Sequence, residues 1–270
     1  MGDIREILTF FAELSRTLRQ QVEMGIGHRP TIQPIQIQRR RLIAPKHTRG
    51  SIMNSQNSLD LNPTRIVSLQ KTRFTEMLIE ENALDQNGFE NWIFCSGMLF
   101  NSPDKWWGDR GQRDYPHEGI DLCLYRDRRQ RTVRLDETTR IPAMHNGVVM
   151  AIFKDYLGKA VVIHHEKLGS EKARFISMYA HITPRPDIEI GTLVQEGDLL
   201  GTFADTSKAK AQILPHLHFS LGLTSLAPSY EGFVWNTIRR SDIITLLDPL
   251  ELIDWPCVGL ERGHPDCLEI

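Results

Sequence analysis

The chain has 270 residues, enough for one domain with an extension or for two small domains. Its composition, 40% hydrophobic and 24% charged, is typical of a soluble globular protein, and its net charge of −2 indicates no overall preference for nucleic acid or for an anionic membrane. No apolar stretch approaches the roughly 20 residues that a membrane-spanning helix needs, so no transmembrane segment is expected.

The first third of the chain predicts helices and a linker rather than a sheet. Apolar side chains recur at helical spacing over residues 4–22, between arginines and glutamates, which predicts an amphipathic helix. Residues 25–62 are rich in Pro, Gln and Arg without lasting periodicity and predict a linker. A second helix is expected over 72–86, before an Asn-Gly pair that would end it. Residues 1–90 are therefore predicted to form an N-terminal extension.

From about residue 90 the sequence pattern changes, and short runs of β-favouring residues alternate with turns rich in Gly, Pro and Asp. Six or seven such runs predict a mainly β domain, an antiparallel sheet closed as a barrel or packed as a sandwich. The segment "DIITLLDPLELI" (242–253) predicts a short helix that caps the sheet. We assign residues 91–255 to this domain and residues 256–270 to a C-terminal tail.

The chain start and the cysteines bear on the cellular compartment. The first 25 residues carry acids and bases throughout and no clean hydrophobic region, so the sequence by itself predicts a cytoplasmic protein. The four cysteines form no CxxC pair, which argues against a cysteine zinc site. Cys257 and Cys267 are either free thiols or a disulfide that closes a small loop, and the sequence leaves both open.

The stretch "PHLHFSL" (215–221) places His216 and His218 one residue apart in an apolar run. In a strand, these two imidazoles project from one face, while Leu217 and Phe219 point into the apolar layer. A lone pair of this kind is more often a satisfied polar pair than a set of metal ligands. Its interpretation therefore depends on whether other segments supply partners.

Two further β segments supply such partners. "PHEGIDLCLY" (116–125) places His117 and Asp121 on one face of an extended chain, and "FISMYAHI" (175–182) ends on His181. Zinc binds imidazole nitrogen and carboxylate oxygen, and a catalytic zinc site uses three protein ligands and leaves a position for water. Four histidines and one aspartate exceed that need, which leaves two histidines for acid–base or electrophilic roles near the metal-bound water.

The other six histidines serve as a comparison. We interpret them as structural or surface residues, with His165 as the first exception to consider. They are His28 and His47 in the linker, His145 before a likely turn, His164 and His165 at a strand end, and His264 in the tail.

The order HxxxD, lone His, HxH resembles the M23 family of zinc metallopeptidases, the LytM and lysostaphin-like group that cuts peptides in bacterial cell walls. The run "GTLVQEGDLLGTF" (191–203) also resembles a hairpin of that family, and the resemblance spans roughly residues 92–254. It implies a small, mainly antiparallel β domain with one Zn²⁺ per chain. By motif position, the zinc ligands would be His117, Asp121 and His218, and the non-ligand catalytic histidines would be His181 and His216.

The resemblance implies a zinc-dependent metallo-endopeptidase that hydrolyses peptide bonds in bacterial peptidoglycan through a metal-activated water. Peptidoglycan peptides would be the partner, no nucleic acid is expected, and the location would be extracytoplasmic and wall-associated, against the cytoplasmic prediction above. The alternatives are a non-catalytic LytM-like scaffold or activator of wall hydrolases, and a metal-dependent amide hydrolase with a non-wall substrate. A lipoyl or biotinyl carrier, suggested by residues 191–203, has no use for the aligned histidines.

Three departures from the family pattern concern the substrate more than the metal. The stretch "ADTSKAKAQIL" (204–214) lacks the glycines common before the HxH motif, and Ser220 stands where the family often has Glu. The arginine-rich residues 126–134 are a solvated loop or a reader of phosphate or anionic glycan. The bond cleaved, the export route and the oligomeric state are not readable, and the linker as an inhibitory cover of the groove is a further hypothesis.

Overall fold

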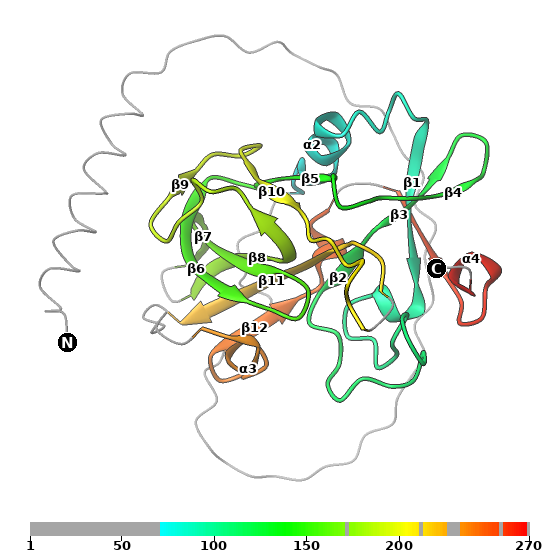
Figure 1. Cartoon of the computed structure of the whole chain (residues 1–270). Helices are drawn as coiled ribbons and strands as arrows, with labels where there is room; N and C mark the ends of the chain where they lie inside the picture. The colour runs from blue at the N-terminus through cyan, green and yellow to red at the C-terminus, as the bar shows by residue number, and fades with distance from the viewer. Residues whose placement is uncertain (1–70, 171–172, 211–212, 226–232, 254–255, 269–270) are drawn as a thin grey trace, which may run out of the picture. The chain divides into compact units, whose positions relative to one another are not determined.

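The computed structural model describes residues 71–170, 173–210, 213–225, 233–253 and 256–268 (Figure 1). The protein is mainly β, with largely antiparallel sheets, as predicted. The helix expected over 4–22 and the linker over 25–62 lie outside the described residues. Within those ranges, none of the helices is both long and apolar enough to cross a membrane.

The larger sheet has nine strands and carries the histidine motifs. Its main path runs β12-β11-β8-β7-β6-β9, while β2 pairs with β11 and β10 pairs with both β5 and β8. The strands are β2 (Ile120–Leu122), β5 (Arg140–Pro142), β6 (Gly147–Lys154), β7 (Lys159–Ser170), β8 (Ala173–Pro184), β9 (Leu193–Val194), β10 (Leu199–Phe203), β11 (Leu217–Ser225) and β12 (Ile244–Leu247).

The smaller sheet has the order β13-β1-β3-β4, and its β13 runs parallel to β1. The chain changes sheets at Cys123, because β2 before it belongs to the larger sheet and β3 after it to the smaller one. The remaining elements are β1 (Phe89–Cys95), β3 (Leu124–Asp127), β4 (Thr132–Arg134), β13 (Cys257–Leu260), α2 (Phe74–Glu81), α3 (Trp235–Ile238), α4 (Pro265–Leu268), and the 3-10 turns η2 (Ser96–Met98) and η3 (Pro249–Glu251).

Along strand β11, successive side chains point to opposite faces of the sheet, so one set enters the core and the other faces the site. Leu217 and Phe219 are fully buried in the main hydrophobic core, where the ring of Phe74 from α2 stacks on Phe219 with ring centroids 4.6 Å apart. His218 lies opposite Ala180 of β8 in the ladder and shares its face. That face packs against the region of α3, where Ile238 joins Ala180 in a second apolar cluster.

Two local predictions were wrong. Residues 242–253 hold strand β12 and the turn η3 rather than a helix, because Ile244–Leu247 pair with the edge of β11 and the Pro249 turn follows. The arginine-rich segment 126–134 forms the β3–β4 hairpin rather than an irregular loop, although Arg128, Arg129 and Arg131 in its turn are exposed, as a solvated segment requires. Asp127 closes it by accepting the backbone N–H groups of Arg129 and Arg131 at 2.9 and 2.8 Å.

The cysteines pair in a way that the sequence did not indicate. Cys267 forms a disulfide with Cys95, 172 residues away, while Cys257 and Cys123 are free. Both sequence-based alternatives for Cys267, a free thiol and a bond to Cys257, are therefore wrong. The reason is that β13 pairs with β1 and brings α4 to the end of that strand.

The helix expected over 72–86 is present as the shorter α2, and its Phe74 and Leu78 belong to the main core. The domain boundaries at residues 91 and 255 stay a prediction. The structure adds that α2 and β13, which lie outside those boundaries, pack against the β domain through the core and through strand pairing.

Candidate metal centre and catalytic histidines

The pairing of β2 with β11 builds the centre of the site. Asp121 on β2 lies directly opposite His218 on β11, and His117 precedes β2 by three residues. Gly119 lets the chain between His117 and Asp121 approach β11 closely, since a Cβ there would overlap with the carbonyl oxygen of Phe219. Two segments nearly a hundred residues apart thus present three polar side chains at one point.

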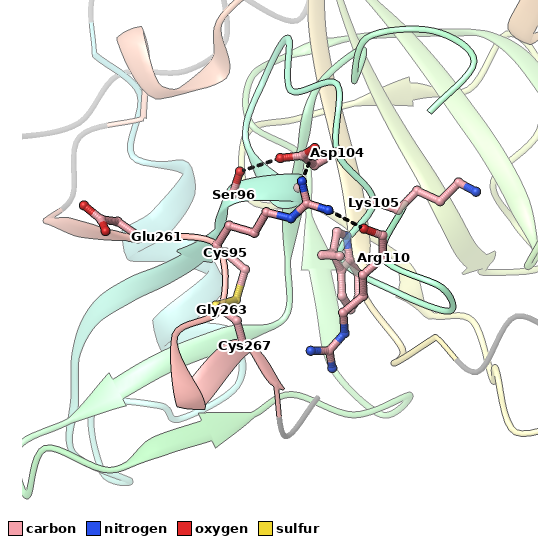
Figure 2. Close-up of a pocket in the computed structure, with 11 residues that line it drawn as sticks. Cys95, Ser96, Asp104, Lys105, Arg110, Glu261, Gly263 and Cys267 are labelled. Carbon is pink, nitrogen blue, oxygen red and sulfur yellow. Dashed lines mark hydrogen bonds and ion pairs between the residues drawn. A yellow bond between two sulfur atoms is a disulfide. The ribbon is translucent and has the colours of Figure 1, made fainter. Parts of the chain in front are cut away.

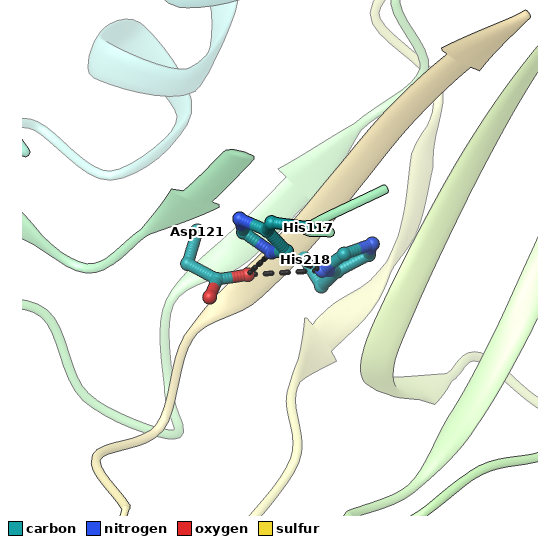
Figure 3. A group of neighbouring side chains, drawn as sticks. All are labelled: His117, Asp121 and His218. Atoms are coloured by element: carbon teal, nitrogen blue, oxygen red, sulfur yellow. Dashed lines mark hydrogen bonds and ion pairs between the residues drawn. The ribbon is translucent and has the colours of Figure 1, made fainter. Parts of the chain in front are cut away.

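The three side chains meet at hydrogen-bond distances (Figure 3). Asp121 Oδ1 lies 3.0 Å from His117 Nε2 and 3.0 Å from His218 Nδ1, and the two imidazole nitrogens are 2.9 Å apart. All three residues are buried, and no other group of three or more potential ligands was found among the described residues. The predicted metal ligands are therefore brought together.

The partners on the outer side of each ring fix which nitrogen faces the centre. His117 Nδ1 lies 3.0 Å from the carbonyl oxygen of Leu99, which can only accept, so Nδ1 carries the proton and Nε2 presents a lone pair inward. His218 Nε2 lies 2.9 Å from Ser220 Oγ, which leaves Nδ1 facing inward. Ser220 thus supplies a hydroxyl that orients the ring of His218, one of the predicted ligands.

Other side chains hold Asp121 through Oδ2, the carboxylate oxygen that does not contact the two imidazoles. Its Oδ2 accepts a hydrogen bond of 2.7 Å from Trp106 Nε1, and the guanidinium of Arg113 lies 3.5 Å away. Burial raises the pKa of Asp121, but the charges and hydrogen bonds of the surrounding histidines outweigh it and hold the pKa well below its usual range. The carboxylate is therefore ionised at neutral pH.

This arrangement fits a zinc ion. Two imidazole nitrogens and a carboxylate oxygen aim lone pairs at one point, and such lone pairs repel each other unless a proton or cation lies between them. Imidazole and carboxylate are ligands that zinc prefers, and outer hydrogen bonds from carbonyl, hydroxyl and indole groups are the usual support for a metal site. These three residues could therefore hold a metal ion, and their donor atoms are of the kind that zinc takes.

His216 lies beside this centre without joining it. Its Nδ1 is 2.7 Å from the carbonyl oxygen of Leu214, so the proton resides there and Nε2 is free to accept one. Nε2 lies 3.9 Å from Asp121 Oδ1, and the ring is edge-on to Trp106 with centroids 5.1 Å apart. Burial is the main reason that the pKa of His216 falls to about 3.

His181 completes the group of five. Its ring centroid is 4.9 Å from that of His216 and 5.7 Å from that of His218. Its side chain is 13% exposed and lies 3.2 Å, through Nδ1, from the buried carboxylate of Asp155. The structure therefore places both predicted catalytic histidines next to the predicted ligands, on the side where His181 reaches solvent.

Short helix α3 borders the site. The ring of Trp235 is edge-on to His218 at 5.1 Å between centroids and lies 6.3 Å from His181. Just after the helix, Arg239 donates a hydrogen bond to Glu118, and its guanidinium lies over the ring of Tyr115 at 4.6 Å. Both contacts join α3 to the segment that carries His117.

The remaining described histidines lie apart from the cluster of four histidines and one aspartate. His145 pairs with Glu196 at 2.9 Å, and His264 is partly exposed near Asp266. His165 is buried, with Nδ1 3.0 Å from the Asn146 carbonyl and Nε2 2.8 Å from Ser177 Oγ, so it is a satisfied structural residue. His28 and His47 lie outside the described residues.

A separate cavity of about 170 Å³ lies beside the disulfide (Figure 2). The Cys95–Cys267 bond, Asp104 and Arg262 line it, and Arg262 lies 3.5 Å from Asp104. Trp106 borders this cavity and also donates to Asp121. None of the five site histidine and aspartate residues lines the cavity, so it is distinct from the candidate metal centre.

Residues 116–227 match the family model "Peptidase family M23". This segment, 112 of the 270 residues of the chain, includes all five residues of the cluster and resembles the peptidases of family M23. No curated protein sequence is similar enough to the chain to count as a relative.

The solved structures that the chain matches include lysostaphin and two peptidases. Lysostaphin is 19% identical over 50% of this chain and 42% of its own, with a TM-score of 0.32. A candidate peptidase M23 from Pseudomonas aeruginosa is 23% identical over 67% of this chain and 61% of its own, at 0.33. A zinc-containing peptidase from Vibrio cholerae is 21% identical over 50% of this chain and 36% of its own, at 0.31. The chain thus spans less than two thirds of each, and similarity at these scores does not define a function.

The five residues predicted from the sequence lie together in the structure, but the sequence did not indicate the residues that support them. Trp106 and Asp155 belong to none of the motifs, and nothing in their local sequence indicates a functional neighbour. Ser220 was noticed only as a departure from the family pattern. Its position two residues after His218 on the same strand face was the signal that the two side chains meet.

Proposed function

We propose that the protein is a zinc-dependent endopeptidase that hydrolyses peptide bonds in bacterial peptidoglycan. The single observation that carries this proposal is the convergence of His117 Nε2, Asp121 Oδ1 and His218 Nδ1 within 4.8 Å of one another, inside a segment of a peptidase family. When bound by these three residues, a zinc ion supplies Lewis acidity, which lowers the pKa of a bound water and polarises the scissile carbonyl.

The chain's own residues then perform the proton transfers and hold the substrate. His216 Nε2, unprotonated and close to Asp121, is placed to accept a hydrogen bond from the attacking water and to orient it. His181, the more exposed of the two, is placed to donate to the developing oxyanion or to the leaving amine. One such donor in a dry site is worth about 3–4 kcal/mol of transition-state stabilisation.

Two other functions compete with this one. A non-catalytic LytM-like scaffold has no need for His181 and His216 beside an intact ligand set, and the structure retains both. A metal-dependent hydrolase of a non-wall amide would use the same five residues. The substrate therefore has to be decided by experiment.

The direct test incubates purified peptidoglycan with the zinc-loaded protein and identifies the released muropeptides by LC–MS. We expect zinc-dependent products, loss of those products with His218→Ala, and unchanged products with the control His264→Ala, since His264 lies outside the cluster. Zinc binding without any product would favour the scaffold or the non-wall hydrolase.

We also propose an extracytoplasmic, wall-associated location. The Cys95–Cys267 disulfide supports it, because such bonds persist in oxidising compartments and are rare in the cytosol. Cell fractionation that recovered the protein only from the cytosol, with both thiols reduced, would contradict this location.

A further inference from the structure

Strand β8 carries an irregularity at the position of His181. Ile182 pairs with Lys159 of β7, and Tyr179 pairs with Val161, so two residues of β8 face the single residue Ala160. This extra residue is a β-bulge, which bends a strand and re-aims a side chain. The backbone of His181 has φ of +60°, a left-handed conformation that is unfavourable for residues other than glycine.

Asp155 compensates for the irregularity from the β6–β7 turn. Its Oδ2 accepts the backbone N–H of His181 at 2.7 Å. Its Oδ1 accepts the backbone N–H groups of Leu157 and Gly158 at 2.9 and 2.7 Å, which anchors the carboxylate within its own turn. The bulged amide, which lies at the break in the β7–β8 ladder, thus has a rigidly held partner.

The same carboxylate oxygen faces the ring of His181. Asp155 Oδ2 lies 3.2 Å from His181 Nδ1 at an angle outside the usual limits for a hydrogen bond, and Nδ1 is buried with no other partner. Burial opposes ionisation of Asp155, but the hydrogen bonds and charge of His181, with the turn amides, keep its pKa below the usual value. A small rotation of the ring would align Nδ1–H with the carboxylate.

The turn can reach β8 only because residue 158 is glycine. A Cβ at Gly158 would collide with the carbonyl oxygen of Ile182 and lie 2.9 Å from the Cβ of Ala204. Ala204 in turn donates its backbone N–H to the carbonyl of His181 at 2.9 Å. The backbone N–H and C=O groups of His181 therefore both have hydrogen-bond partners in neighbouring segments, and these partners hold its unusual conformation.

We propose that Asp155 is the positioning residue of His181. It holds the bulged backbone and keeps the proton on Nδ1, so that Nε2 is the ring nitrogen that serves the reaction. This inference rests on the proposed function for its catalytic meaning, although the tautomer itself does not depend on activity. The logic is that of a carboxylate that orients a catalytic imidazole and fixes its tautomer.

The test uses full-length, zinc-loaded protein and the variant Asp155→Asn. The amide oxygen of Asn can still accept from Leu157 and Gly158, but its NH₂ group then faces the two donors of His181. The matched control is Asp127→Asn, because Asp127 is also buried in a hairpin turn and accepts two turn amides, yet has no histidine partner.

We expect Asp155→Asn to lower kcat on peptidoglycan about 10- to 100-fold with little change in KM or in zinc content, while Asp127→Asn leaves kcat unchanged. His181→Ala should lower kcat at least as far, and the double variant Asp155→Asn/His181→Ala should match His181→Ala alone. Equal kcat for Asp155→Asn and wild type, or losses that multiply in the double variant, would overturn the proposal.

A second readout separates this inference from the proposed function. Imidazole ¹⁵N NMR of histidine-labelled protein near pH 8 should show His181 protonated at Nδ1 in the wild type, with the Nε2–H form appearing in Asp155→Asn. If the wild type releases no muropeptides but the tautomer changes as expected, the proposed function fails and the positioning role stands. An unchanged tautomer in Asp155→Asn would refute the positioning role whether or not the wild type is active.

Discussion

Removal of the Cys95–Cys267 disulfide should strongly destabilise the β domain. The bond joins residues 172 positions apart, and the closed segment includes the whole larger sheet and three of the four strands of the smaller one, β3, β4 and β13. In the chain-entropy model, a closed loop of this length restricts the unfolded chain by about 5 kcal/mol at 25 °C, and native disulfides removed from proteins typically cost 2–5 kcal/mol. We therefore expect Cys95→Ala/Cys267→Ala to lose about 2–5 kcal/mol of unfolding free energy.

Equilibrium urea denaturation, followed by tryptophan fluorescence, measures this loss. Reduction of the wild type should give a loss of similar size, because it opens the bond without removing a sulfur atom. The control Cys257→Ala, which removes an exposed free thiol, should stay within about 0.5 kcal/mol of wild type. A double variant as stable as the wild type, or a peptide map without the Cys95–Cys267 linkage, would refute the reasoning.

Two further perturbations test the supports of the site and the buried histidines. Trp106→Phe removes the indole N–H that binds Asp121 Oδ2 at 2.7 Å, so zinc affinity should fall about 10- to 100-fold in a chelator competition, and an unchanged affinity would contradict the supporting role. His165 is 1% exposed and lies beside His145 and His164. Burial lowers its pKa to about 4 in the folded protein. Between pH 6.5 and 4, the unfolded chain therefore binds a proton at His165 that the folded protein does not bind. Stability should therefore be complete above pH 6.5 and fall by up to about 3 kcal/mol as the pH drops to 4. Urea titrations across this range should show a shallower pH dependence for His165→Gln, and a dependence identical to wild type would contradict the assignment.

Part of the site could be predicted from the sequence because some of its residues lie close together along the chain. The period of two along a strand was enough to place His216 and His218 on one face and to send Leu217 and Phe219 into the core. The family resemblance then supplied the partners on two other segments. The structure brings all five side chains together, while their roles as metal ligands and catalytic groups stay predictions.

What the sequence did not reveal depends on contacts between distant segments. Asp155 sits in a turn that reads like any Asx turn, and its role appears only because the bulge at His181 lies against it. Cys267 pairs with Cys95 because β13 joins β1, a parallel pairing across most of the chain. The misassigned β12 is a strand because β11 offers it an edge, and its local sequence is also compatible with a helix.

The most direct test of the central claim is zinc binding and peptidoglycan cleavage measured on the same preparations. We expect one zinc per chain by elemental analysis, muropeptide products that disappear on chelation and return with zinc, and loss of both zinc and products with Asp121→Ala. A protein that binds no zinc, or that releases the same products after complete chelation, would contradict the assignment of His117, Asp121 and His218 as the ligands of a catalytic metal.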